Sequence, residues 1–270
     1  MTRNIRQVII LICLLVLSPM ACPVFATTVA IPNSHHWDSY SPWTSVYGGS
    51  SIDSSQSAPG SSSGALRFRY PTGFHVGNAP DKVWVNFTPI SEIWVQYWAK
   101  YSGNFDFRQN GHKHAYWKLS GSATNFFIYR TGDPGDPDGN MAFIFQRTGS
   151  DHVSGIRYSN GPHISAGVWY KFTIHAVLNT GENANGVFQL WVNDQQVINS
   201  SNIPYLKGSD VGKQIGSMEF TPVWGSQSGD VKPAEDYFWV DCTTISNDPI
   251  GVVPTSGGKN PEPPSNLGIR

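Results

Sequence analysis

The chain has 270 residues, with 18 Lys and Arg side chains against 19 Asp and Glu, and a formal net charge of −1. Without Arg3 and Arg6, which lie in a predicted leader, 16 basic side chains remain against the 19 acidic ones, a net charge of −3. A surface of this charge is a poor partner for nucleic acid. The roughly 230 residues that follow the leader are enough to bury one large core as a single domain.

The first 26 residues have the pattern of an export signal. Arg3 and Arg6 precede an apolar run over residues 8–16, and residues 24–26 approximate a small-x-small cleavage site, so we expect cleavage after Ala26. The run is too short for a membrane span, and a polar sequence follows it. The sequence therefore predicts a secreted or periplasmic protein. Lipid attachment at Cys22 is a less favoured alternative, because Pro19 stands where such signals usually have Leu.

Only one of the three cysteines lies in the predicted mature chain. Cys13 and Cys22 belong to the leader, which leaves Cys242 without a partner for an intramolecular disulfide. An exported protein of this kind must be held together by its own core. We expect it to be a monomer.

Short runs of β-branched and aromatic residues recur between Gly, Pro, Asn and Asp clusters, and no amphipathic helical period persists. This pattern predicts an all-β fold, a two-sheet antiparallel β-sandwich of the jelly-roll type, over residues 27–251. Residues 50–64 are rich in Ser and Gly and are predicted to form a mobile loop, and residues 252–270 a Pro/Gly-rich tail. The clearest predicted strands are 66–70, 92–101, 114–119, 125–130, 141–147, 168–178, 187–193, 216–221 and 236–245.

The strand over residues 92–101 carries the clearest alternation of side chains. One set suits the interior: Ile93, Val95, Tyr97, Ala99 and Tyr101. The other set combines two indoles with an amide and an ammonium group: Trp94, Gln96, Trp98 and Lys100. Flat rings stack on sugar C–H faces and polar tips bond hydroxyl groups, so this second set predicts a polysaccharide-binding face. With 10 Trp in the chain, each indole can equally be ordinary packing.

The densest polar cluster begins the next strand, at residues 112–118. Cleavage of a uronate polymer by a lyase needs a cation or amide to offset the carboxylate, a base for the C5 proton and an acid for the leaving oxygen. The side chains that offer these groups are Gln96, Lys113, His114, Tyr129 and Arg130, with Tyr116 as a further sugar contact. A basic surface hairpin without a catalytic task is the alternative.

Sequence motifs for metal binding or hydrolysis are absent or weak. The sequence has no zinc helix and no paired-cysteine metal site, so no metal ligand set is predicted. Asp136, Asp138 and Asn140 resemble half of a calcium loop, but we favour a hairpin turn and expect no cofactor. Glu219 and Asp241 would have to pair across strands for a glycoside hydrolase, since retaining hydrolysis needs two carboxyls about 5 Å apart.

Three remaining aromatic or imidazole side chains have two interpretations each. His175 lies in mid-strand, where a histidine is more often a structural group than a catalyst. Trp191 and Trp224 are either sugar platforms or packing under loops, and Trp224 is retained as a candidate sugar contact.

The segments 94–107, 168–172, 178–181, 186–194, 238–241 and 249–251 resemble the concanavalin-A-like sandwiches of polysaccharide lyases, especially alginate and glucuronan lyases. The resemblance covers about residues 66–251. It implies a catalytic lysine at Lys113 and an arginine near Arg130. Where alginate-cleaving members have a Tyr-x-Tyr pair, the resemblance places Phe143 and Phe145 of this chain. A phenyl ring cannot exchange a proton.

The leading hypothesis is therefore a carbohydrate-active protein that cleaves a uronate-containing polymer by β-elimination. Lys113 or Arg130 would offset the carboxylate, and Tyr129 or His114 would move the proton. The alternatives are a non-catalytic glycan-binding or adhesion module, which Phe143 and Phe145 favour, and a glycoside hydrolase of the same fold.

Overall fold

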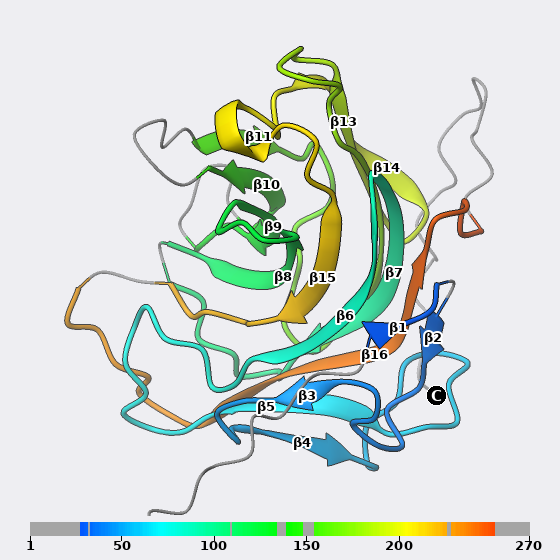
Figure 1. The fold of residues 1–270 in the computed structure, drawn as a ribbon. Helices are drawn as coiled ribbons and strands as arrows, with labels where there is room; N and C mark the ends of the chain where they lie inside the picture. The colour runs from blue at the N-terminus through cyan, green and yellow to red at the C-terminus, as the bar shows by residue number, and fades with distance from the viewer. Residues whose placement is uncertain are drawn as a thin grey trace, which may run out of the picture.

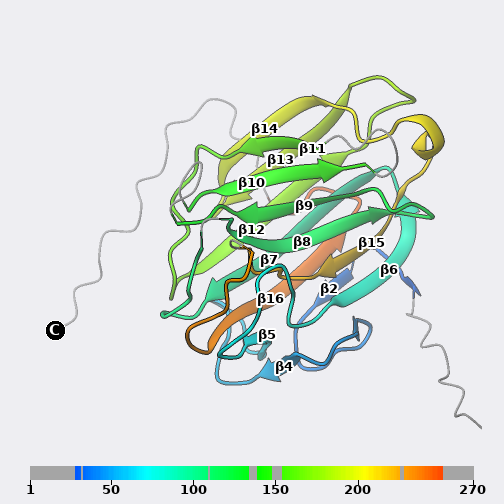
Figure 2. The same ribbon diagram turned by 90° about the vertical axis from the view of Figure 1, so that its left-hand side faces the viewer.

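The computed structural model describes residues 28–31, 33–108, 110–133, 139–147, 154–225 and 228–251, with the backbone alone for 154–158. Two β-sheets of eight strands each pack face to face (Figures 1 and 2). The only helical element in these ranges is a 3-10 turn, η1 (Gly208–Asp210). The expected all-β, two-sheet sandwich is confirmed.

Sheet A contains the polar segment that begins at residue 112. All its strand pairs are antiparallel except β1–β6, which is parallel. Figure 2 looks onto this sheet, with β8 to β11 lying one above another. The strands, in spatial order, are β1 (Thr28–Val29), β6 (Val83–Ile90), β15 (Ile215–Phe220), β8 (His112–Leu119), β9 (Asn125–Arg130), β10 (Met141–Gln146) and β11 (Ser154–Tyr158), with β3 (Thr44–Ser45) beside β6.

Sheet B lies behind sheet A in Figure 2 and is antiparallel throughout. The strongly curved strand β7 lies near its centre, between β12 and β16. The strands, in spatial order, are β14 (Gln195–Ile203), β13 (Gly186–Val192), β12 (Trp169–Val177), β7 (Glu92–Tyr101), β16 (Asp236–Ser246), β5 (Ala65–Tyr70) and β4 (Ser50–Asp53), with β2 (Asn33–His35) beside β16.

The core fills the space between the sheets and is rich in aromatic rings. Side chains alternate between this core and the outer faces, because successive residues of a strand point to opposite sides. On β12, for example, Phe172, Ile174 and Ala176 are fully buried, whereas His175 is on the outer face. Phe143 of sheet A stacks on Phe188 of sheet B with ring centroids 3.7 Å apart. Such rings join the two sheets without a disulfide.

The strands predicted from the sequence are all present, with bounds shifted by at most two residues. The expectation of a loop over residues 50–64 is wrong at its start, because residues 50–53 form β4 and pair with β5. The predicted leader and tail lie outside the described residues. Within the described ranges, no helix is long and apolar enough to cross a membrane.

Candidate functional site

The outer face of sheet A turns away from sheet B and carries the polar side chains of β6, β15, β8, β9 and β10. On β8, a bulge between Lys113 and Ala115 places both His114 and Ala115 on the inner side. Lys113, Tyr116 and Lys118 therefore point outward, although simple alternation over the whole strand would not group them.

Lys113 and Tyr129 are directly paired across strands β8 and β9. The side chains of directly opposed residues lie about 5 Å apart at Cβ. The Lys113 ammonium group is 4.7 Å from the centroid of the Phe127 ring and 5.8 Å from that of Tyr116. Burial against these rings lowers the pKa of Lys113 from its usual value. This lysine–tyrosine pair thus combines a partly desolvated cation with a half-buried phenol.

The backbone register extends this pair across the sheet. Tyr129 is opposite Ala142 of β10, and Ala142 is opposite Tyr158 of β11. The phenol of Tyr129 therefore has a small neighbour on one side and the lysine on the other.

A second cross-strand series lies beside the pair and contains the one carboxylate on the strands of sheet A, Glu219. Glu219 is opposite Tyr116 on one side and Trp84 on the other. Its Oε2 atom lies 2.9 Å from the Lys118 ammonium group and 3.2 Å from that of Lys82. With Lys113, three lysines therefore lie on or beside the strands of sheet A, whose one carboxylate is Glu219.

Several of these residues were not predicted from the sequence. Trp84 lies on β6 and Lys82 directly before it, and no strand was predicted there. The alternation of Val83, Trp84, Val85 and Asn86 is a strand signal that could have revealed it. Of the predicted residues, Lys113, Tyr116 and Tyr129 are brought together.

His114 is not available to a substrate. It belongs to a buried hydrogen-bond chain that runs Tyr97–His114–Tyr101–His112–Tyr70 between the sheets, and all five side chains are at most 1% exposed. Burial lowers the pKa of His114 to about 3, so the ring is neutral at neutral pH. The expected role of His114 as a proton carrier in catalysis is therefore corrected to a structural one.

The donor and acceptor roles along this series of hydrogen bonds follow from its Tyr70 end. The Tyr70 hydroxyl donates to the carbonyl oxygen of Pro222 at 2.6 Å, so its oxygen accepts from His112 Nε2–H at 2.7 Å. His112 Nδ1 then accepts from the Tyr101 hydroxyl at 2.9 Å, and the Tyr101 oxygen accepts from His114 Nε2–H. Burial lowers the pKa of both histidines, so both rings are neutral, and in this arrangement each carries its proton on Nε2.

Arg130 is also structural. Its side chain is fully buried, with Nε donating to the Ile164 carbonyl at 2.7 Å and Nη2 2.7 Å from an oxygen of Asp133. The guanidinium group lies 3.4 Å from the centroid of the Phe107 ring. Among the described residues its guanidinium group has no exposed surface, so the role expected for it in binding a substrate carboxylate is corrected to a structural one.

Gln96, Trp94, Trp98 and Lys100 are on one face, as predicted, but this is the outer face of sheet B. The Gln96 amide donates to Thr173 at 3.0 Å, and Trp94 stacks on His175 with centroids 4.0 Å apart. Lys100 donates to Gln56 at 3.1 Å. These residues lie on the opposite side of the sandwich from Lys113, so the expected convergence of Gln96 with Lys113 is wrong.

Two further expectations are corrected by burial. Trp224 is fully buried, and its Nε1–H donates to the carbonyl of Asp106 at 2.8 Å, so it is packing rather than a sugar contact. Phe143 and Phe145 are 0% and 4% exposed and face the core, whereas Ala142 is their outward neighbour in the Tyr129 row. The phenylalanines therefore do not stand at outer-face positions, and they carry no evidence against catalysis.

The carboxyl pair of a hydrolase is not assembled. Glu219 is on the outer face of sheet A, and Asp241 is on β16 of sheet B with no exposed surface. Of the half calcium loop, Asp136 and Asp138 lie outside the described residues.

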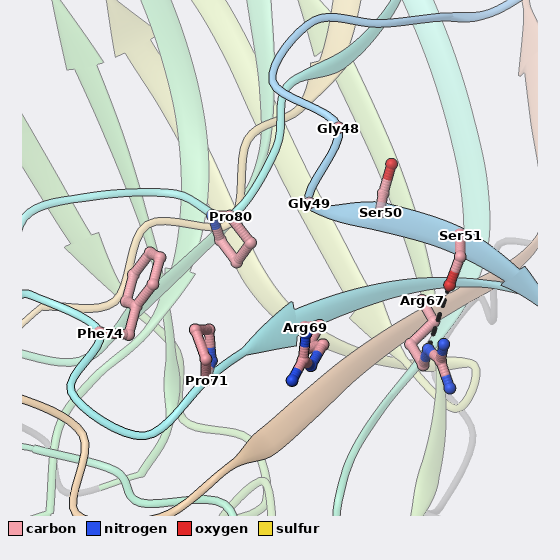
Figure 3. Close-up of a pocket in the computed structure, with 9 residues that line it drawn as sticks. All are labelled: Gly48, Gly49, Ser50, Ser51, Arg67, Arg69, Pro71, Phe74 and Pro80. Atoms are coloured by element: carbon pink, nitrogen blue, oxygen red, sulfur yellow. Dashed lines mark hydrogen bonds between the residues drawn. The ribbon is translucent and has the colours of Figure 1, made fainter.

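Two pockets lie where loops meet the sheets. One, of about 620 Å³, is lined by Thr221 and Val223 among others, and Val223 accepts the Lys113 backbone N–H at 3.0 Å. The wall of this pocket is therefore joined to the backbone of Lys113, although neither Lys113 nor Tyr129 lines it. The other, of about 380 Å³, is shown in Figure 3 with Arg67 and Arg69 at its rim. It contains no outer-face residue of sheet A, and Arg69 is paired with Glu235 at 2.6 Å.

Comparisons with known proteins find similar folds among solved structures, although the sequence itself has no match. No family model matches the sequence, and no curated protein does. Among solved structures, the fold is similar to endo-β-1,4-glucuronan lyase from Trichoderma reesei, with a TM-score of 0.57, 13% identity, and coverage of 80% of this chain and 94% of that one. It is also similar to the alginate lyase from Aplysia kurodai (TM-score 0.56, 13% identity, 76% and 90% coverage) and to the cellulose induced protein Cip1 (0.54, 14%, 81% and 99%).

Proposed function

From this lyase-like fold, we propose that the protein is an exported polysaccharide lyase that cleaves a uronate-containing polymer by β-elimination. The observation that carries the proposal is the pairing of Lys113 with Tyr129 on the outer face of sheet A. Because His114 and Arg130 are buried, Lys113 is left to offset the carboxylate charge and Tyr129 to move the proton.

Lys113 offsets the charge of the uronate carboxylate. Proton removal at C5 places negative charge on that carboxylate, and a nearby cation stabilises it most where water is excluded. The rings of Phe127 and Tyr116 exclude water from one side of the ammonium group.

Tyr129 moves the proton. Its phenolate takes the C5 proton, and the electron pair of that C–H bond forms the C4–C5 double bond as the C4–O bond breaks. The phenol then gives its proton to the leaving oxygen, which restores the phenolate and balances the reaction.

The charge of the face supports a polyanionic substrate. Lys82, Lys113 and Lys118 share the face with Glu219 alone among carboxylates on the strands of sheet A. This excess of cations attracts an acidic chain, although the whole protein is slightly acidic. It also disfavours hydrolysis by a carboxyl pair, for which Glu219 has no strand partner in this sheet.

Two substitutions test the assignment. Lys113→Ala is expected to lower turnover by about 10²–10³-fold and Tyr129→Phe by about 10²–10⁴-fold, measured as ultraviolet absorbance of the unsaturated uronyl product. The matched control is Lys171→Ala, which removes a lysine paired with Asp194 on sheet B and should leave the rate unchanged. Equal rates in all three variants would refute the roles of Lys113 and Tyr129.

A second candidate function is glycan binding without cleavage, by the outer face of sheet B. The half-buried indoles of Trp98 and Trp169 flank this face, with the Lys100 ammonium group 5.9 Å from the Trp169 ring centroid. Retention on a polysaccharide gel that is lost in Trp98→Ala and kept in Lys113→Ala, with no unsaturated product from the parent protein, would favour it.

A further inference from the structure

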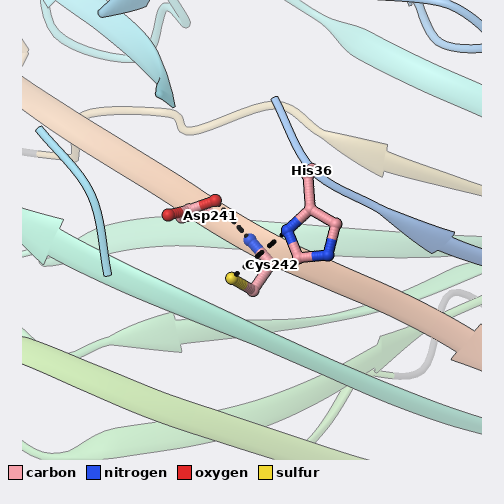
Figure 4. A group of neighbouring side chains, drawn as sticks. All are labelled: His36, Asp241 and Cys242. Atoms are coloured by element: carbon pink, nitrogen blue, oxygen red, sulfur yellow. Dashed lines mark hydrogen bonds between the residues drawn. The ribbon is translucent and has the colours of Figure 1, made fainter. Parts of the chain in front are cut away.

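Three metal-ligating side chains meet on sheet B, away from the lysine–tyrosine pair. His36 follows β2, and Asp241 and Cys242 are consecutive on β16 (Figure 4). One ligand atom from each, an imidazole nitrogen, a carboxylate oxygen and the thiol sulfur, lies within 4.8 Å of the other two. The Cys242 Sγ and His36 Nδ1 atoms are 3.8 Å apart. We call these residues the cysteine cluster.

The backbone of β16 is altered where the cluster forms. In a regular strand, Asp241 and Cys242 would point to opposite faces. Here the pairing of β16 with β7 shifts register between Asp241 and Thr244, and Cys242 has a φ of 48°, a left-handed conformation that is uncommon for a residue with a side chain. This irregularity is what lets the carboxylate and the thiol approach the same imidazole.

The Asp241 carboxylate is held in place by donors around it. Its Oδ2 accepts the Ala58 backbone N–H at 2.8 Å, and its Oδ1 accepts the Cys242 backbone N–H at 2.7 Å and the Ser63 hydroxyl at 3.3 Å. The carboxylate also accepts from the Cys242 thiol, whose proton a bound metal ion would replace. Donors that orient a ligand in this way are typical of the second shell of metal sites.

The mixture of ligands selects the class of cation. Thiolate and imidazole favour borderline or soft metals and disfavour calcium and magnesium, which prefer oxygen alone. In a tetrahedral zinc site with the usual bond lengths, the sulfur and nitrogen ligands are about 3.6 Å apart. The 3.8 Å between Sγ and Nδ1 is close to that separation.

We propose that His36, Asp241 and Cys242 bind Zn²⁺ or a similar thiophilic divalent cation, with water as the fourth ligand. Binding forms a metal–sulfur bond and releases the thiol proton to solvent. The cation would tie the segment after β2 to β16, to which β2 is joined by only three residue pairs. It would cross-link the N-terminal segment in a domain that has no disulfide among its described residues.

Zinc binding by the untagged mature protein, stripped with a chelator, tests the proposal. We expect calorimetry to give one Zn²⁺ per chain and the Tm to rise with Zn²⁺ concentration. Cys242→Ser and His36→Gln should each weaken binding by at least about 100-fold. The matched control, His75→Gln, removes an exposed histidine outside the cluster and should bind as the parent does.

Cobalt provides a readout that surface histidines cannot give. Co²⁺ bound by the parent protein should show a thiolate-to-metal charge-transfer band, and Cys242→Ser should lack it while remaining folded by circular dichroism. If the parent shows no such band, or if Cys242→Ser and His36→Gln bind Zn²⁺ as tightly as the parent, the cation is held at surface histidines only and the proposal is wrong.

Discussion

The buried hydrogen-bond chain of tyrosines and histidines should make the fold sensitive to mild acid. His112 and His114 are neutral in the fold, and burial lowers the pKa of both, that of His114 to about 3. In the unfolded chain a histidine has a pKa of about 6.5. Below that pH the unfolded chain binds more protons than the fold does, so the free energy of unfolding decreases as the pH falls.

The magnitude follows from these pKa values. For His114 at pH 5, protonation of the unfolded chain favours unfolding by about 2 kcal/mol. His112 acts in the same direction and adds to this loss, which for His114 alone is already a sizeable share of the 5–15 kcal/mol that stabilises a typical domain. The loss begins near the unfolded pKa and continues until the pH reaches the folded pKa.

Urea unfolding at pH 7 and pH 5 measures this effect. The matched control replaces both rings with non-titrating amides, His112→Gln with His114→Gln, so that the contributions of His35 and of the carboxylates cancel. We expect the parent protein to lose at least about 2 kcal/mol more than this variant between the two pH values. Equal losses, or an assigned His112 or His114 ring that titrates near pH 6.5 in NMR spectra of the folded protein, would refute the account.

Three further predictions concern the core and the site. Phe143→Ala should lower the free energy of unfolding by about 3–5 kcal/mol in urea, because it empties the space against Phe188, and a loss below 1 kcal/mol would contradict the packing. Asp236→Asn should lower the free energy of unfolding by about 3 kcal/mol or more, because it leaves the buried Lys232 charge without its partner. Asp194→Asn, at an exposed pair, should lower it by less than about 1 kcal/mol, and similar losses in the two variants would contradict the prediction. Glu219→Gln should strengthen binding of a uronate polymer or weaken it by no more than about two-fold, because it removes the negative charge between Lys82 and Lys118. Loss of binding in an affinity gel would show that this carboxylate has another role.

Alternation of side chains could be predicted from the sequence wherever a strand is regular. On β7 it separates the buried Tyr97 from the outward Trp98 correctly, because nothing interrupts the strand. It could not show which sheet β7 joins, since pairing with β12 and β16 depends on contacts far apart in the sequence. That is why Gln96 was expected beside Lys113.

The errors within single strands have local causes. Alternation alone puts His114 on the opposite face from Lys113, so the two could not both meet a substrate. The bulge after Lys113 adds Ala115 to the inner side and brings Tyr116 and Lys118 to the face of Lys113, and a bulge leaves no signal in the residue pattern of this segment. On β10, Ala142 and Ile144 are as apolar as Phe143 and Phe145, so the inward set could not be identified from hydrophobicity. Arg130 looked available because an arginine is rarely fully buried, and only the structure reveals the carbonyls and the Asp133 carboxylate that satisfy it.

The chromophore of the elimination product tests the central claim most directly. Purified mature protein is incubated with alginate, glucuronan and glycosaminoglycan in turn, and ultraviolet absorbance is followed beside Tyr129→Phe. The account predicts a rise with at least one uronate polymer that falls by about 10²-fold or more in the variant. No rise with any of them, or release of reducing sugar without the chromophore, would contradict it.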